Sequence, residues 1–97
     1  ITAEEAKQIM DSEEGYIILD VRTQEEYDQG HIPGAMLIPD TEIETKAEEV
    51  LTDKDQLLLV YCRSGRRSKL ASEILVELGY TNIKEFGGII DWPYEIE

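Results

Sequence analysis

Hydrophobic residues gather in two short, nearly unbroken runs along the chain. Residues 16–21 read YIILDV, and residues 57–62 read LLLVYC. A continuous apolar run of this length is typical of a strand buried on both faces, as in a parallel sheet covered by helices. Two shorter segments, 35–38 and 82–86, have the size and the neighbouring Gly or Pro residues of further strands. The pattern therefore predicts several parallel strands.

Two threonines carry the signal of a helix start. Thr2 is followed three residues later by Glu5, and Thr23 is followed three residues later by Glu26. This spacing is that of a capping box, in which each side chain accepts a hydrogen bond from the other residue's backbone amide. We therefore expect one helix to begin after Thr2, and a short second helix to begin after Thr23 and to stop at Gly30.

Two further helices are predicted by apolar residues that recur on one helical face. These residues are Ile43, Ala47, Val50 and Leu51 in the first segment and Leu70, Ala71, Ile74, Leu75 and Leu78 in the second. We expect Ser68 to cap the second of these helices and Gly79 to follow its last turn. Helices that alternate with buried strands indicate an α/β domain.

Length, composition and charge narrow the class of protein. With 97 residues, of which 41% are hydrophobic, residues 1–97 are expected to form one domain with its own core. The net charge of −13 argues against binding to nucleic acid or to an anionic membrane surface. No apolar run approaches the length of a membrane span, and no basic segment followed by an apolar one opens the chain. We expect a cytoplasmic protein, with the reservation that a chain starting at Ile1 could have been trimmed.

The chain has one cysteine, Cys62, and one histidine, His31. A single cysteine cannot form an intramolecular disulfide, and one cysteine with one histidine cannot build a closed structural zinc site. No metal is therefore expected. A lone cysteine is ordinarily an inert buried residue, so a function for Cys62 must be argued from its surroundings.

The surroundings of Cys62 are those of an anion site. Residues 62–68 read CRSGRRS and lie between the end of a predicted buried strand and the start of a predicted helix. Ligands of open α/β sheets bind outside the carboxyl ends of the strands, where a helix N-terminus offers free amides and the positive end of a dipole. Gly65 supplies the backbone freedom that a tight loop of amides requires.

The same loop concentrates positive charge in an acidic protein. Arg63, Arg66, Arg67 and Lys69 are four of the nine lysine and arginine residues, and they fall within eight positions. A thiol among amides and guanidinium groups loses its proton easily, so we predict that the pKa of Cys62 is lowered and that its sulfur is an exposed thiolate. The alternative is an inert cysteine at a strand end beside a solvated run of arginines.

Three blocks of sequence together resemble a known family. The first block contains residues 20–22 (DVR), 26–27 (EY), 30–35 (GHIPGA) and 38–39 (IP). The second is the loop at residues 62–68, and the third is residues 87–89 (GGI) followed by Trp92. In this order and spacing, over nearly the full chain, the blocks resemble a single-domain rhodanese of the rhodanese-like sulfurtransferase family.

The resemblance implies a three-layer, rhodanese-like α/β fold with a central, parallel, five-stranded sheet flanked by helices. It also implies an enzyme of the thiosulfate sulfurtransferase type, in which Cys62 takes sulfur from thiosulfate or a persulfide donor as a persulfide. The sulfur then passes to cyanide or a thiol acceptor, and no cofactor is expected. The active loop would span residues 62–67, and the residues that would bind the donor anion are Arg63, Ser64, Gly65, Arg66, Arg67 and Ser68.

Four other residues of these blocks are given supporting roles. Asp20 and Arg22 stand at the carboxyl end of the other buried strand, so they could lie near the loop, behind the residues that would touch the donor. An ion pair that fixes the architecture is the preferred interpretation over a chemical role. His31 lies far along the chain from the cysteine, and no general base is needed if the resting sulfur is a thiolate. We interpret His31 as structural and Trp92 as a packing residue.

Two other functions fit parts of this pattern. Cysteine phosphatases and arsenate reductases of a related fold use a cysteine, five residues and an arginine that clamps a tetrahedral oxyanion. Here that position is Ser68, and Arg67 comes one residue early. The other function is a persulfide carrier or docking module, whose acidic surface would recruit a basic partner enzyme. With one cysteine, the protein cannot resolve its own persulfide, so sulfur transfer needs an external acceptor.

Overall fold

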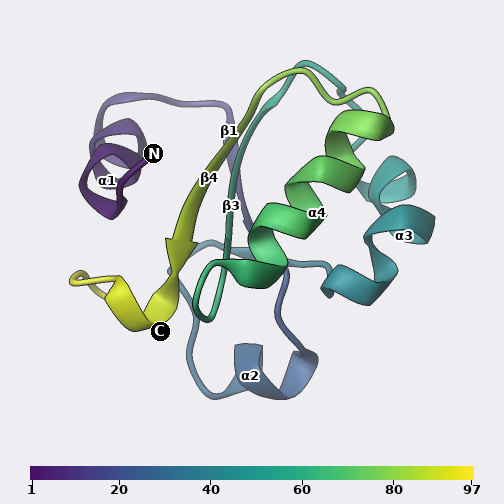
Figure 1. Cartoon of the computed structure of the whole chain (residues 1–97). Helices are drawn as coiled ribbons and strands as arrows, with labels where there is room; N and C mark the ends of the chain where they lie inside the picture. Colours follow the sequence, from purple (N-terminus) through teal and green to yellow (C-terminus); the bar gives the residue numbers. More distant parts are fainter.

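Four parallel strands form one sheet in the computed structural model, which describes residues 1–97 (Figure 1). The strands are β1 (Tyr16–Asp20), β2 (Met36–Leu37), β3 (Leu57–Cys62) and β4 (Ile83–Gly88), in the order β2-β1-β3-β4. β1 and β3 pair with each other in the middle of the sheet. They coincide with the two nearly unbroken apolar runs, so the prediction of buried parallel strands is confirmed.

Helices cover both faces of the sheet. α1 (Ala3–Ser12) lies on one face, and α3 (Ile43–Val50) and α4 (Arg66–Glu77) lie together on the other (Figure 1). The short α2 (Gln24–Asp28) lies beyond the carboxyl ends of the strands, next to the loop that follows β3. Two single 3-10 turns are η1 (Asp40–Glu42) and η2 (Ile89–Asp91). This is the three-layer α/β architecture that the resemblance implied, and none of its helices has the length and apolar character that a bilayer span needs.

The alternating side chains of β3 divide the core in two. Leu58, Val60 and Cys62 join a buried cluster of 12 residues on the face covered by α3 and α4. Leu59 and Tyr61 join a cluster of 7 buried residues on the other face, beneath α1. Cys62 is therefore anchored in the larger core, on the side of the sheet that α4 covers.

Both predicted capping boxes are present. The Thr2 hydroxyl accepts a hydrogen bond from the backbone amide of Glu5 at 3.0 Å, and the Glu5 carboxylate accepts one from the amide of Thr2 at 3.1 Å. Thr23 and Glu26 exchange the same pair of bonds at the start of α2. The starts of the first two helices are thus set by local chemistry that the sequence shows directly.

The two later helices keep most of their predicted apolar faces. Val50 and Leu70 are the exceptions, because they are 47% and 51% exposed while their sequence neighbours take the buried positions. The expectation that Ser68 caps α4 is wrong. Gly65 occupies the cap position and Ser68 lies in the first turn of the helix. Gly79 follows the end of α4 with a φ of +99°, as predicted.

The sheet has four strands and not the five that the resemblance implied. The edge of β4 is met instead by the first residue of the chain, because the amino group of Ile1 donates a hydrogen bond to the backbone oxygen of Glu85 at 2.9 Å. α1 already begins at Ala3. One bonded residue beside β4 does not make a strand, so the expected fifth strand is absent.

Candidate active site

Glycine occupies two positions that make the loop after Cys62 tight. Gly65, at the cap of α4, has a φ of +105°, a left-handed conformation that residues with side chains rarely adopt. Gly88 of β4 is the strand partner of Cys62, and a Cβ atom at Gly88 would lie 2.0 Å from the backbone oxygen of Arg63. The loop and β4 therefore approach so closely that only glycine fits at position 88.

Hydrogen bonds from this loop surround the Cys62 sulfur. The amide of Gly65 donates to Sγ at 3.0 Å, and the hydroxyl of Ser68 lies 3.4 Å from Sγ. Burial raises the pKa of the thiol, but hydrogen bonding with the Ser68 hydroxyl and with the amides of Ser68, Gly65 and Ser64 outweighs burial and lowers the pKa from its ordinary value. The direction agrees with the expectation from sequence, and the main favourable cause is hydrogen bonding rather than guanidinium charge.

The Cys62 side chain is buried, which corrects the expectation of an exposed sulfur. The residue has 0% relative exposure and belongs to the larger core cluster. The loop wraps the sulfur closely enough to donate a hydrogen bond to it, and the same wrapping excludes solvent. A reactant can therefore reach the sulfur only after the surrounding residues shift.

The three arginines of the loop have different surroundings. Arg63 and Arg66 are exposed, and no carboxylate lies within ion-pair distance of either. Arg67 instead forms a bidentate ion pair with Glu26 of α2, in which Nη1 and Nη2 donate to the two carboxylate oxygens at 2.7 and 2.9 Å. This ion pair, together with hydrogen bonds from Thr23, lowers the pKa of Glu26 to about 2. Two cations thus remain free beside the loop, while the third ties α4 to α2.

Asp20 and Arg22 form a buried ion pair at the carboxyl end of β1. Nη2 of Arg22 lies 2.7 Å from Oδ2 of Asp20 and donates to the backbone oxygen of Gly30 at 2.7 Å. The Tyr61 hydroxyl donates to the same Asp20 oxygen at 2.6 Å and accepts from the amide of Ile32 at 3.1 Å. This network joins β1, β3 and the turn after α2, and it makes no hydrogen bond to the loop after β3. These contacts agree with the interpretation of the pair as an architectural one.

His31 and Trp92 also serve the architecture. The His31 ring stacks on Tyr27 with 3.8 Å between ring centroids, and its backbone pairs with that of Glu97. Trp92 packs against Phe86 with 5.5 Å between ring centroids. Neither side chain forms a hydrogen bond or ion pair with the cysteine loop, so the sequence interpretation of both agrees with their surroundings.

Glu85 belongs to the site although the sequence analysis does not single it out. Its Oε2 atom accepts a hydrogen bond from the Ser68 hydroxyl at 2.5 Å and another from the amide of Gly87 at 2.8 Å. Glu85 pairs across the sheet with Val60, which lies two residues before Cys62 and on the same face of β3. Only this register between β3 and β4 could have indicated Glu85, because no motif marks it.

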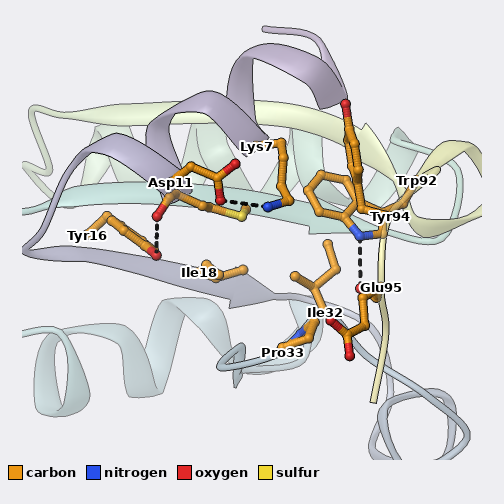
Figure 2. A pocket seen from close by; sticks show the side chains of 10 residues that line it. Lys7, Asp11, Tyr16, Ile18, Ile32, Pro33, Trp92, Tyr94 and Glu95 are labelled. Atoms are coloured by element: carbon orange, nitrogen blue, oxygen red, sulfur yellow. Dashed lines mark hydrogen bonds and ion pairs between the residues drawn. The ribbon is translucent and has the colours of Figure 1, made fainter.

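Of three hollows in the surface, one borders the loop. Its volume is about 320 Å³, and its lining includes Arg63, Ile89 and Ile90. Figure 2 shows another hollow, of about 210 Å³, between α1 and the C-terminal segment, where Trp92 and Lys7 face each other. No residue of the loop lines this second hollow. The structure has no group of three or more His, Cys, Asp or Glu side chains suited to hold a metal ion.

Known proteins are similar to this chain in sequence and fold. The family model described as Rhodanese-like domain matches residues 2–93. Thiosulfate sulfurtransferase PspE of Escherichia coli (strain K12) is 42% identical over 73 residues, which cover 75% of this chain and 70% of PspE. YrkF of Bacillus subtilis (strain 168) is 41% identical over 98 residues, which cover 100% of this chain but only 52% of YrkF. A solved structure described as a rhodanese with anions from E. coli has a TM-score of 0.78 and 38% identity, and the match covers 84% of this chain and 96% of that chain. Together with the cysteine loop at the carboxyl end of a parallel strand, these matches show that the chain belongs to the rhodanese-like domain family.

Proposed function

We propose that this chain is a sulfurtransferase that carries sulfane sulfur as a persulfide on Cys62. The supporting observation is the hydrogen bonding at Sγ, which accepts from the Gly65 amide and contacts the Ser68 hydroxyl, and which lowers the pKa of the thiol despite its burial. A cysteine in this state can attack sulfur without a neighbouring base. PspE is named a thiosulfate sulfurtransferase, so thiosulfate is the donor to test first.

The proposed reaction has two displacements at sulfur. The Cys62 thiolate attacks the outer sulfur of thiosulfate, a new S–S bond forms, and the S–S bond of thiosulfate breaks with its electron pair on the departing sulfite. Cyanide or a thiolate then attacks the outer sulfur of the persulfide, and Cys62 leaves as the thiolate. Neither displacement needs a general base, which fits a site where the single histidine, His31, is engaged with Tyr27.

Arg63 and Arg66 provide the attraction for an anionic donor. Both are exposed and unpaired in a protein whose net charge is −13, so they form a local positive region at the loop. Arg63 also lines the hollow beside the loop, together with the apolar residues Ile89 and Ile90. We place the approach of the donor in this hollow, followed by a shift of residues 63–65 that admits it to the buried sulfur.

The phosphatase alternative loses support from the same geometry. A phosphatase needs an arginine free to clamp two oxygens of a phosphoryl group. Arg67 is engaged with Glu26 at 2.7 and 2.9 Å, and Ser68 occupies the position where the clamp would stand. The persulfide-carrier alternative uses the same Cys62 chemistry and differs only in handing the sulfur to a docked partner.

Thiocyanate formation from thiosulfate and cyanide tests the proposal. We expect turnover by the natural chain and none by Cys62→Ser, a variant that preserves the size of the side chain and should unfold at a similar temperature. A phosphate ester assayed in parallel should stay intact with both proteins. Phosphate release that depends on Cys62, in the absence of thiocyanate formation, would overturn the proposal in favour of the phosphatase.

A further inference from the structure

The Ser68 hydroxyl has one hydrogen and several acceptors within reach. Its Oγ lies 2.5 Å from Oε2 of Glu85, 3.0 Å from the backbone oxygen of Gly65, and 3.4 Å from both the Cys62 sulfur and the backbone oxygen of Gly87. A hydroxyl donates one hydrogen bond at a time. Because the contact to the carboxylate is the shortest, the hydrogen of Ser68 points to Glu85, and the Cys62 thiol can donate to Ser68 Oγ.

Glu85 is fixed in place for this contact. Its Oε2 also accepts from the amide of Gly87, and its backbone oxygen accepts from the amino group of Ile1. Its strand partner is Val60, whose side chain lies on the same face of the sheet as Cys62. The carboxylate therefore lies on the cysteine side of β4, next to the first turn of α4.

We propose that Glu85 is a positioning residue for the sulfur chemistry, because it competes with the Cys62 sulfur for the single hydroxyl hydrogen of Ser68. The inference rests on the proposed function of Cys62 as the sulfur carrier. When Cys62 loses its proton, Sγ can no longer donate to Ser68 and gains from accepting the hydroxyl hydrogen instead. Turning the hydroxyl to Sγ breaks its bond to Glu85, so the carboxylate keeps the thiolate more basic than it would otherwise be.

This competition has a consequence for reactivity. A more basic thiolate is the stronger nucleophile towards sulfur, whereas a less basic one is present in larger amount at low pH. Glu85 thus sets the balance between the amount of thiolate and its strength. The hydrogen bond from the Gly65 amide stabilises the thiolate independently of Glu85, because that bond does not involve Ser68.

The other charges near the sulfur are already engaged. The pKa of Arg67 is raised first by its bond to Glu26, and also by the nearby charges of Cys62 and Asp40. Arg67 thus faces the sulfur from α4, with Glu26 of α2 and Asp40 of η1 around it. Glu85 is the carboxylate that faces the site from β4, and among these charged groups only Glu85 forms a hydrogen bond with Ser68.

The test is the pH midpoint of Cys62 alkylation by iodoacetamide in the full chain. In Glu85→Gln a neutral amide of the same shape accepts more weakly, so we expect the midpoint to fall and the rate well below the midpoint to rise about three- to tenfold. Glu85→Asp keeps the charge but is too short to hold Ser68, and we expect a fall there too. In Ser68→Ala the midpoint should rise. When Glu85→Gln is added to Ser68→Ala, it should shift the midpoint by less than half of the shift that it causes in the natural chain. The matched control is Glu77→Gln, which removes an exposed charge at the far end of α4.

The midpoint is the readout because looser packing would change the alkylation rate at every pH alike. An unchanged or higher midpoint in both Glu85 variants would overturn the inference. An equal shift caused by Glu85→Gln in the natural chain and in Ser68→Ala would overturn it too. The alkylation needs no sulfur donor. If thiosulfate adds no sulfur to Cys62 while the shifts occur as expected, the proposed function fails and the competition for Ser68 stands.

Discussion

Replacing Gly88 with alanine should push the cysteine loop away from β4. The new Cβ atom would lie 2.0 and 2.4 Å from the backbone oxygen and carbon of Arg63, and 2.6 Å from Cα of Ser64. Ordinary contact begins at 3.4 Å, so the loop must retreat by about 1.4 Å, and backbone atoms cannot do this by turning a side chain. Overpacking of this kind costs about 1–3 kcal/mol of stability. A displacement of about 1 Å at reacting atoms costs on the order of 100-fold in rate.

The assay is the rate of thiocyanate formation, with stability followed by urea unfolding. Gly34→Ala is the control for strain without crowding, because Gly34 has a left-handed φ (+83°), unlike the extended Gly88 (φ −131°), and nothing lies within 4 Å of its Cβ position. We expect both variants to lose stability and only Gly88→Ala to lose transfer activity, by roughly 100-fold. Full activity of folded Gly88→Ala, or an equal loss in Gly34→Ala, would refute the view that close contact between loop and strand sets the geometry at the sulfur.

Three further predictions concern the charged residues. Arg67→Ala should cost about 1 kcal/mol of stability at neutral pH after allowance for solvent screening. Because the folded-state pKa of Glu26 (about 2) lies below its usual value of 4.5, this contribution to stability is present above about pH 4.5 and fades as the pH falls towards 2. The stabilities of the two proteins in urea should therefore converge in acid. Arg63→Ala and Arg66→Ala should each raise the KM for thiosulfate about three- to tenfold and leave kcat unchanged. High salt should raise the KM of the natural enzyme by screening the same charges. An unchanged KM in the variants would contradict the role of the free cations. Asp20→Asn should cost about 3–5 kcal/mol in thermal or urea unfolding, because the buried guanidinium loses its counter-charge, and a loss under 1 kcal/mol would contradict the architectural role.

Features set by neighbouring residues could be predicted from the sequence. The capping boxes of Thr2 and Thr23 depend on residues three positions apart, and the strands at residues 16–20 and 57–62 depend on runs of apolar residues. The left-handed turn at Gly65 follows from a glycine in a short segment between strand and helix. Each of these signals acts over a few residues, so one sequence is enough to show it.

Features that depend on the register of the sheet were missed. The need for glycine at position 88 arises because β4 places it against Arg63, and the contact of Glu85 with Ser68 arises because the same strand places Glu85 beside Val60. No local pattern shows which residue of one strand faces which residue of the next. The pairing of Arg67 with Glu26 spans 41 positions and was missed for the same reason.

Two sequence-based expectations, for Ser68 and Cys62, failed because each residue takes a position other than the usual one for its residue type. Serine is a favourable helix cap, but Ser68 lies in the first turn of α4, where its hydroxyl reaches the cysteine sulfur. A cysteine with a lowered pKa suggested an exposed thiolate, but Cys62 gains its stabilisation from loop hydrogen bonds that also bury it. In both cases, the role in the site decides the position.

The intact mass of the protein before and after treatment with thiosulfate tests the central claim most directly. The account predicts that the natural chain gains the mass of one sulfur atom, loses it again when cyanide is added, and that Cys62→Ser gains nothing under the same conditions. No gain in the natural chain, or an equal gain in Cys62→Ser, would contradict the claim that Cys62 carries the transferred sulfur.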